Sequence, residues 1–144
     1  MTNTRTSTLI RVLFLALAAT VASVGLLSAE DPKGTFTLPF EVRWGTAVLP
    51  PGDFSFKVDN TNYVITIRGE NQAAMVISNE RRIDNHAGTS ALIVARYGKR
   101  CTVRALRLAE QKVVFSYPAP RGERPMLAQA PELLQRIPIL MASK

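Results

Sequence analysis

The chain has 144 residues, a formal net charge of +7, one cysteine and one histidine. A single cysteine excludes an internal disulfide, so the fold must be held by packing alone. The basic residues are dispersed rather than gathered in a long run, which argues against nucleic acid as a partner. The positive net charge favours a modest attraction to anionic glycans or lipid head groups instead.

Residues 1–29 follow the order of a secretory signal peptide. Arg5 and Arg11 precede an apolar run over residues 12–27, and small residues up to Ala29 come before an acidic pair. The apolar run is shorter than the roughly 20 residues that a bilayer-spanning helix needs. The sequence therefore predicts cleavage near Ala29, export to the periplasm or the extracellular space, and membrane contact only through this segment. The alternative is an uncleaved anchor.

The rest of the chain, residues 30–144, is long enough for one domain, and we predict a single exported β-domain. Its first strand spans residues 35–44, where apolar and polar side chains alternate as in a strand with one buried face. The apolar positions are Phe36, Leu38, Phe40, Val42 and Trp44. Pro39 cannot donate a backbone hydrogen bond, so it predicts an edge strand or a bulge.

The corner at Pro50-Pro51-Gly52 reverses the chain, because Gly52 can adopt positive φ. Six further strands follow with turn signals about every ten residues. They are expected at residues 53–58, 63–68, 73–78, 90–97, 100–108 and 112–117.

The pattern predicts an all-β fold: an antiparallel β-sandwich or a small barrel of about seven strands, since both give the same alternation. In the fourth strand Met75 and Ile77 are expected to face the core. In the sixth, Cys101, Val103, Ala105 and Arg107 are expected to share one face. Residues 79–89 are expected to form a polar connection.

Residues 118–144 are rich in proline. We predict a Pro-rich connection and then a docked tail that is irregular or short-helical, with helical turns at residues 126–129 and 132–136. The apolar residues 137–141 are expected to add a late strand. The alternative is a tail that binds a partner.

No catalytic, cofactor or metal constellation is expected. His86 lies in a polar loop with Glu80 and Asp84, a group that would hold a cation only weakly. Cys101 is interpreted as a small buried residue on a strand. The alternatives for Cys101 are an intermolecular disulfide or a reactive thiol, and an enzyme that uses this thiol is the least favoured function.

Four basic residues gather around the hairpin of the fifth and sixth strands. They are Arg96, Lys99, Arg100 and Arg104. They form the candidate surface for an anionic ligand, with an anionic glycan, a lipid head group or an envelope protein as the expected partner. The alternative is that these charges protect strand edges from aggregation.

These observations favour a non-enzymatic envelope or extracellular binding or interaction module. The alternative is a structural or assembly protein that pairs through a strand edge or through the apolar tail.

Three stretches together resemble a family of small exported β-proteins of soil bacteria. They are residues 36–42 (F-T-L-P-F-E-V), 49–54 (L-P-P-G-D-F) and 96–100 (R-Y-G-K-R). The family pattern is an F-x-x-P-F strand, an L-P-A-G-x-Y corner and an H-R-Y-G-D-R-Y hairpin. Pro51, Phe54, Ala95, Lys99 and Cys101 depart from it. The resemblance implies export and a β-fold, and it implies no mechanism because the family has no assigned activity.

Overall fold

The computed structural model describes residues 30–119 and 133–143. Residues 31–144 form one compact unit, and the fold described below is that of this unit. The predicted signal peptide at residues 1–29 and the predicted helical turn at residues 126–129 lie outside the described residues.

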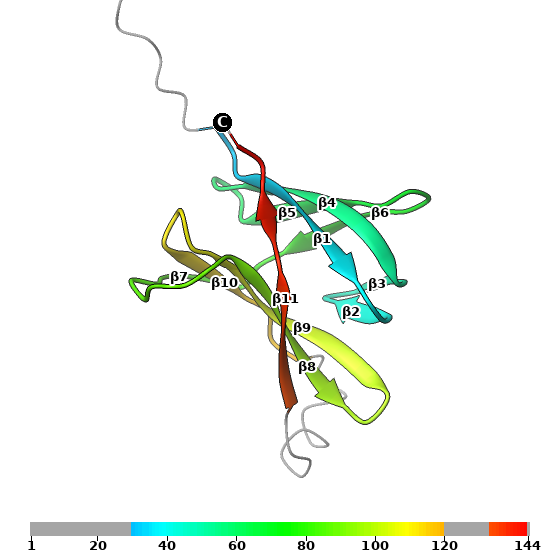
Figure 1. Cartoon of the computed structure of the whole chain (residues 1–144). Helices are drawn as coiled ribbons and strands as arrows, with labels where there is room; N and C mark the ends of the chain where they lie inside the picture. Colours follow the sequence, from blue (N-terminus) through cyan, green and yellow to red (C-terminus); the bar gives the residue numbers. More distant parts are fainter. Residues whose placement is uncertain (1–29, 120–132, 144) are drawn as a thin grey trace, which may run out of the picture. The chain divides into compact units, whose positions relative to one another are not determined.

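The described residues form twelve strands in two sheets (Figure 1). The strands are β1 (Lys33–Leu38), β2 (Val42–Trp44), β3 (Ala47–Leu49), β4 (Gly52–Asp59), β5 (Val64–Arg68), β6 (Ala73–Ile77), β7 (Glu80–Ile83), β8 (Ala91–Tyr97), β9 (Arg100–Leu108), β10 (Val113–Ser116), β11 (Leu133–Pro138) and β12 (Leu140–Met141).

Sheet A has the order β12-β1-β4-β5-β6, and sheet B has the order β11-β8-β9-β10-β7 with β2 and β3 attached through β9. All pairs are antiparallel except β2 with β9. In this part of the chain the sheets are not closed into a barrel. The predicted all-β class is therefore confirmed, and the two sheets are consistent with a β-sandwich.

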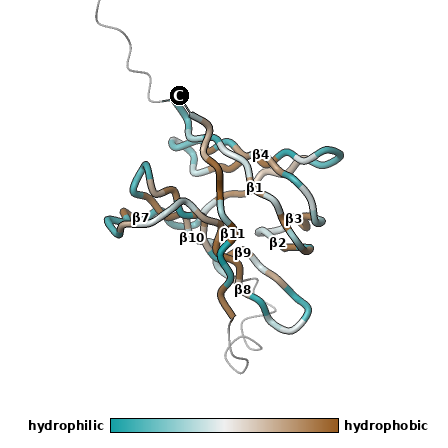
Figure 2. Tube along the Cα trace, viewed as in Figure 1, coloured by the Kyte–Doolittle hydropathy of each residue, from teal (hydrophilic) through white to brown (hydrophobic). Residues whose placement is uncertain are grey.

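The core lies between the sheets because their strands alternate as expected. Along β1 and β4 exposed and buried residues follow one another, and the hydrophilic residues gather at the turns (Figure 2). Sheet A contributes Phe36, Phe54, Phe56, Ile65 and Ile67 to the core. Sheet B contributes Leu92, Val94, Val103, Leu106, Leu108 and Phe115.

Trp44 joins the two sheets at the centre of this core. Its ring lies 6.0 Å from the ring of Phe36 in β1 and makes a T-shaped contact of 5.5 Å with Tyr117, which follows β10. Phe36 in turn stacks on Phe54 at 5.7 Å. Such aromatic pairs add about 0.5–1.5 kcal/mol each beyond the area they bury. Phe36, Trp44 and Tyr117 thus connect the two sheets.

The prediction of one strand over residues 35–44 is wrong, because the chain changes sheets within it. β1 ends at Leu38 in sheet A, and β2 begins at Val42 in sheet B. Pro39 lies in the break, where its missing N–H costs no ladder hydrogen bond. A two-residue turn at Gly45-Thr46 then leads into β3, with Gly45 at φ 60°. The expected positive φ of Gly52 is confirmed at 146°.

The prediction that Met75 and Ile77 face the core is also wrong. Their exposed fractions are 69% and 67%, whereas Val76 between them is 4% exposed. All five residues of β6 are apolar, so the sequence carries no contrast between its two faces. Pairing with β5 determines which face of β6 is buried, because it places Val76 opposite the buried Ile65.

The predicted faces of β9 are wrong because the strand contains a β-bulge. The register passes from Ile93 opposite Ala105 to Val94 opposite Val103, so Arg104 is the extra residue. A bulge shifts the alternation by one residue. Cys101 and Val103 therefore share the core face with Leu106 and Leu108, rather than with Ala105 and Arg107.

The helical turn predicted at residues 132–136 is wrong where the structure describes it, because residues 133–136 belong to a strand. β11 pairs with β8 over six residues, from Leu133 opposite Arg96 to Pro138 opposite Ala91. The chain then crosses to sheet A, where β12 pairs with β1 (Figure 1). β7 lies within residues 79–89, where a polar connection was expected. Together with β3 and the division of residues 35–44, these segments raise the predicted count of about seven strands to twelve.

Gly34 allows β12 to approach β1. A Cβ atom at this position would lie 2.7 Å from the carbonyl oxygen of Leu140 and 2.9 Å from the Phe56 ring. The first contact is with backbone, which cannot move without breaking the pairing of Gly34 with Met141.

Gly34→Ala is expected to destabilise the protein by about 1–3 kcal/mol, as other overpacked sites do. Thr35→Ala, on the exposed face of the same strand, should have a smaller effect and serves as the control. Urea denaturation of both variants measures the difference. Equal stability of Gly34→Ala and wild type would contradict the close approach of β12.

Candidate functional site

Cys101 is buried in the core at the start of β9, as the sequence predicts. Burial raises the pKa of the Cys101 thiol, and the positive charge of Arg96 opposes this rise only in part. A buried thiol that stays protonated is a poor nucleophile. The position of Cys101 therefore does not favour an enzyme built on it.

The structure does not bring the four basic residues of the hairpin onto one surface. Arg96 lies over the Phe40 ring, 5.9 Å from its centroid, and its Nε donates a hydrogen bond to the Gly98 carbonyl. Lys99 and Arg100 line a small pocket together with Arg43. Arg104, the bulge residue, lines a separate groove with Tyr117.

Asp84 and His86 are held by Arg107 rather than arranged for a cation. One carboxylate oxygen of Asp84 accepts hydrogen bonds from the backbone N–H of His86 and lies 2.7 Å from its Nδ1. The other lies 2.7 Å from Arg107 Nε. The His86 hydrogen bonds are the main cause that lowers the pKa of Asp84. In residues 30–119 and 133–143 no group of three His, Cys, Asp or Glu side chains is placed to bind a metal.

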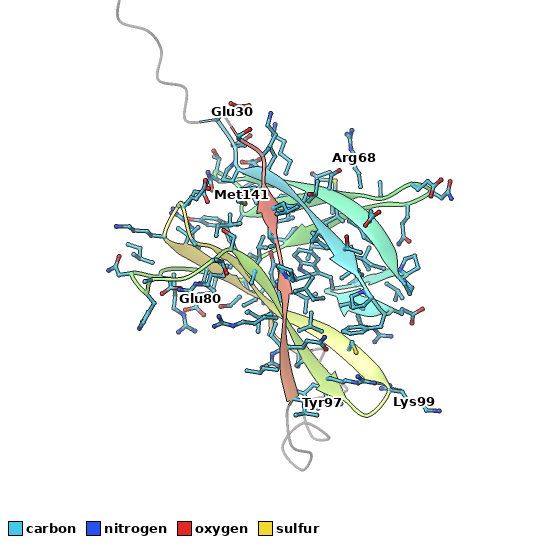
Figure 3. The ribbon with its side chains drawn as sticks, viewed as in Figure 1. Glu30, Arg68, Glu80, Tyr97, Lys99 and Met141 are labelled. Atoms are coloured by element: carbon cyan, nitrogen blue, oxygen red, sulfur yellow. The ribbon has the colours of Figure 1, made fainter. Side chains whose placement is uncertain are left out.

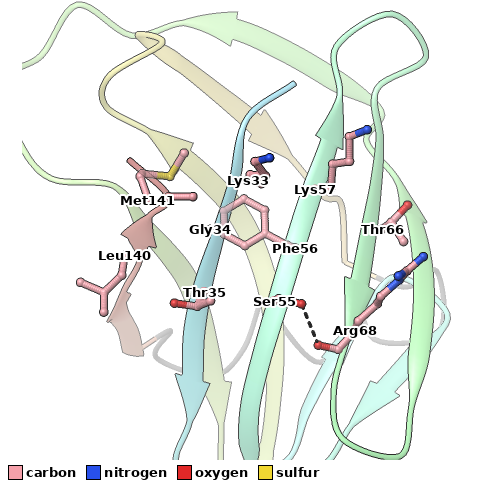
Figure 4. A pocket seen from close by; sticks show the side chains of 11 residues that line it. Lys33, Gly34, Thr35, Ser55, Phe56, Lys57, Thr66, Arg68, Leu140 and Met141 are labelled. Carbon is pink, nitrogen blue, oxygen red and sulfur yellow. Dashed lines mark hydrogen bonds between the residues drawn. The ribbon is translucent and has the colours of Figure 1, made fainter. Parts of the chain in front are cut away.

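A groove on the outer face of sheet A is the better candidate site. Its volume is about 520 Å³, and we call it the sheet A groove (Figure 4). Its polar lining consists of Lys33, Thr35, Ser55, Lys57, Thr66 and Arg68. Its remaining lining comes from Gly34, Phe56, Leu140, Met141 and Ala142.

Cross-strand pairing sets the polar side chains in two rows. In one row Lys33 lies opposite Lys57, which lies opposite Thr66. In the next row Thr35 lies opposite Ser55, which lies opposite Arg68. Directly opposed residues on one face have Cβ atoms about 4.5–5.5 Å apart. Three cations and three hydroxyl groups thus share one small area of a sheet whose other face is the core.

The charges of this area are only partly balanced. Lys57 Nζ lies 3.3 Å from Asp31 Oδ2, in an exposed ion pair. The Arg68 guanidinium has no ion-pair partner in the described part of the chain, while its backbone carbonyl accepts a 3.4 Å hydrogen bond from Ser55 Oγ. Directly opposed like charges destabilise a sheet, as at Lys33 and Lys57. An anion placed between these lysines would relieve that repulsion.

The sheet A groove and the predicted hairpin surface are distinct. Arg68 and Lys99 lie at opposite ends of the unit in Figure 3. The alternation did contain a signal for the groove, because the outward residues of three predicted strands are mostly hydroxyl-bearing or basic. Which of these residues are neighbours depends on the pairing of β1 with β4 and of β4 with β5, which the sequence does not give.

Comparison of the chain with protein-family models, with curated proteins and with solved structures finds no match. The resemblance to small exported β-proteins therefore stays a prediction. Within the described residues no helix is long and apolar enough to span a bilayer.

Alkylation of Cys101 tests its burial. Iodoacetamide at pH 8 is expected to modify the folded protein far more slowly than the same protein in denaturing urea, because burial limits both access and thiolate formation. Mass spectrometry over time gives the two rates. Alkylation of the folded protein at the rate of the unfolded chain would contradict this burial and restore the thiol as a candidate nucleophile.

Proposed function

We propose that the protein is an exported, non-enzymatic binding module, and that its ligand carries negative charge and lies in the sheet A groove. The observation that carries this proposal is the pair of neighbouring rows that places Lys33, Lys57 and Arg68 beside three hydroxyl groups. Cations attract an anion, and neighbouring hydroxyl groups donate hydrogen bonds to its oxygen atoms.

The chemistry of the groove supports binding rather than catalysis. Its polar lining supplies hydroxyl, ammonium and guanidinium groups, and no carboxylate is among the lining residues. Asp31 pairs with Lys57, and Asp59 lies two residues after Lys57 on the same face of β4. General acid–base catalysis would need a group that titrates near neutral pH. The eleven residues that line the groove include no histidine, cysteine, aspartate or glutamate.

Export through residues 1–29 is part of this proposal. It places the domain in the periplasm or outside the cell, where anionic glycans, lipid head groups and acidic surfaces of envelope proteins are available. The expected absence of disulfides is compatible with this location, because packing around Trp44 joins the sheets.

Binding of a soluble polyanion tests the proposal. Wild-type protein should bind alginate, a carboxylated polysaccharide, and added salt should weaken the binding because exposed charges are screened. Arg68→Ala should lower the affinity by about two- to fivefold, the value of an exposed charge interaction. Isothermal titration measures both.

Arg81→Ala is the matched control, since it removes the same charge from the exposed strand β7 of sheet B. It should retain most of the wild-type affinity. Equal losses in both variants would show that alginate responds to net charge alone, and would contradict a site in the groove.

The free edge of β6 favours a second candidate function, assembly through strand pairing. The bonds from Ser78 N to Tyr63 O and from Gly69 N to Gln72 O fix which residues face β5. The backbone groups of Ala73, Met75 and Ile77 consequently point to the open edge.

The edge strands β7 and β11 of sheet B carry protection that β6 lacks. Charged side chains and proline discourage edge-to-edge pairing. β7 contains Glu80, Arg81 and Arg82, and β11 contains Arg136 and Pro138. β6 has the sequence A-A-M-V-I, with no charge and no proline. Two copies of β6 could therefore pair in antiparallel fashion and join their A sheets.

Native mass spectrometry tests this assembly. The wild type should form a dimer, and Met75→Lys should be monomeric at the same concentration because it places a charge on the open edge. Leu133→Lys, at an exposed leucine of β11, should remain dimeric. A monomeric wild type, or dissociation by Leu133→Lys instead, would contradict pairing through β6.

A further inference from the structure

Large apolar side chains flank the cations on the outer face of sheet A. Leu140 in β12 lies opposite Thr35 and is 75% exposed. At the opposite edge of the sheet, on the same outer face, Met75 of β6 lies opposite Thr66, and Ile77 is its neighbour. Exposed apolar residues scattered singly need no explanation, whereas several on one face around a charged centre mark an interaction surface.

We propose that this face docks on a membrane surface that contains anionic lipid. Lys33, Lys57 and Arg68 meet the lipid phosphates, and Leu140, Met75 and Ile77 enter the boundary between head groups and acyl chains. The inference rests on the proposed function and specifies its ligand. It departs from the expectation that only residues 1–29 contact the membrane.

The groove at the centre of this face is complementary to such a surface, because three cations and no carboxylate line it. Its cations share the face with hydroxyl groups that hydrogen-bond phosphate oxygens. Carboxylates lie around these cations: Asp31 pairs with Lys57, and Asp53 accepts a 2.6 Å hydrogen bond from Thr37 Oγ1. Asp59, two residues after Lys57 on the same face, accepts hydrogen bonds from Thr61 and Asn62. Anionic lipid that reaches the groove meets its three cations, and the attraction decays over about one Debye length.

The apolar residues separate a membrane from a soluble polyanion as the ligand. Leu140, Met75 and Ile77 have aliphatic or thioether side chains. Their contribution to binding is favourable only when they leave water for an apolar medium. A soluble anionic glycan in the groove would leave them in water. The boundary region of a bilayer admits apolar side chains while their cationic neighbours stay among the head groups.

Vesicle sedimentation tests the inference with protein purified from an exporting host. Wild type should sediment with vesicles of phosphatidylglycerol and phosphatidylethanolamine, and should stay in solution with phosphatidylcholine vesicles. Arg68→Ala should lower the partition coefficient about fivefold, the effect of one cation near an anionic surface. Arg81→Ala, which loses the same charge from sheet B, should change it little.

The apolar contribution has its own variants. Leu140→Ser should lower partitioning roughly tenfold, because the variant lacks a leucine side chain that the bilayer would partly bury. Leu133→Ser, at an exposed leucine of sheet B, is the matched control and should partition as wild type does. Ile77→Ser, on the opposite edge of sheet A, should repeat the loss, so the test does not depend on whether β12 stays paired in Leu140→Ser.

The outcomes separate this inference from the proposed function. Alginate binding that depends on Arg68, together with no sedimentation on anionic vesicles, would overturn membrane docking and leave the anion-binding groove intact. Sedimentation unaffected by Leu140→Ser and Ile77→Ser would overturn the docking geometry. Failure to bind either alginate or vesicles would overturn both proposals.

Discussion

The contact of Trp44 with Phe36 is the interaction on which the rest of the structure depends. Phe36 belongs to sheet A and Trp44 to sheet B, so this pair joins the layers directly, and Tyr117 makes a T-shaped contact with the same indole. The chain can place both residues in the core only because it changes sheets at Pro39. With one cysteine, the protein has no covalent alternative to this packing. One face of sheet A therefore packs in the core, and its other face can contact a ligand.

The candidate site is the reverse side of the same alternation that builds the core. Thr35 lies between Phe36 and Gly34, and Ser55 lies between Phe54 and Phe56, so each buried ring fixes the direction of its polar neighbour. Side chains held on strands are positioned more precisely than side chains on loops. Lys33 and Lys57 are directly opposed like charges, which destabilise a sheet, and Asp31 forms an ion pair with Lys57. Such a local conflict between stability and charge is typical of a surface that serves a ligand.

The sequence was informative where its pattern contained contrast. The strands around Phe36, Phe54 and Ile65 were predictable because polar and apolar residues alternate in them, and the burial of Cys101 followed from its place on a strand. Prediction failed where contrast is missing: β6 is apolar throughout, so nothing in A-A-M-V-I marks Met75 and Ile77 as exposed. It failed again where one residue changes the alternation, as Arg104 does in β9. The groove could be predicted only in part: the alternation marks its polar residues as outward, but its rows arise from pairing between strands.

The central claim is that the ligand contacts the outer face of sheet A and not the β8–β9 hairpin. Amide chemical-shift mapping of the exported protein, titrated with short-chain phosphatidylglycerol below its micelle concentration, tests this directly. The account predicts shifts at Thr35, Ser55, Lys57 and Arg68, with the amides of Lys99 and Arg100 unchanged. Shifts confined to Lys99 and Arg100 would contradict it and would return the hairpin as the binding surface.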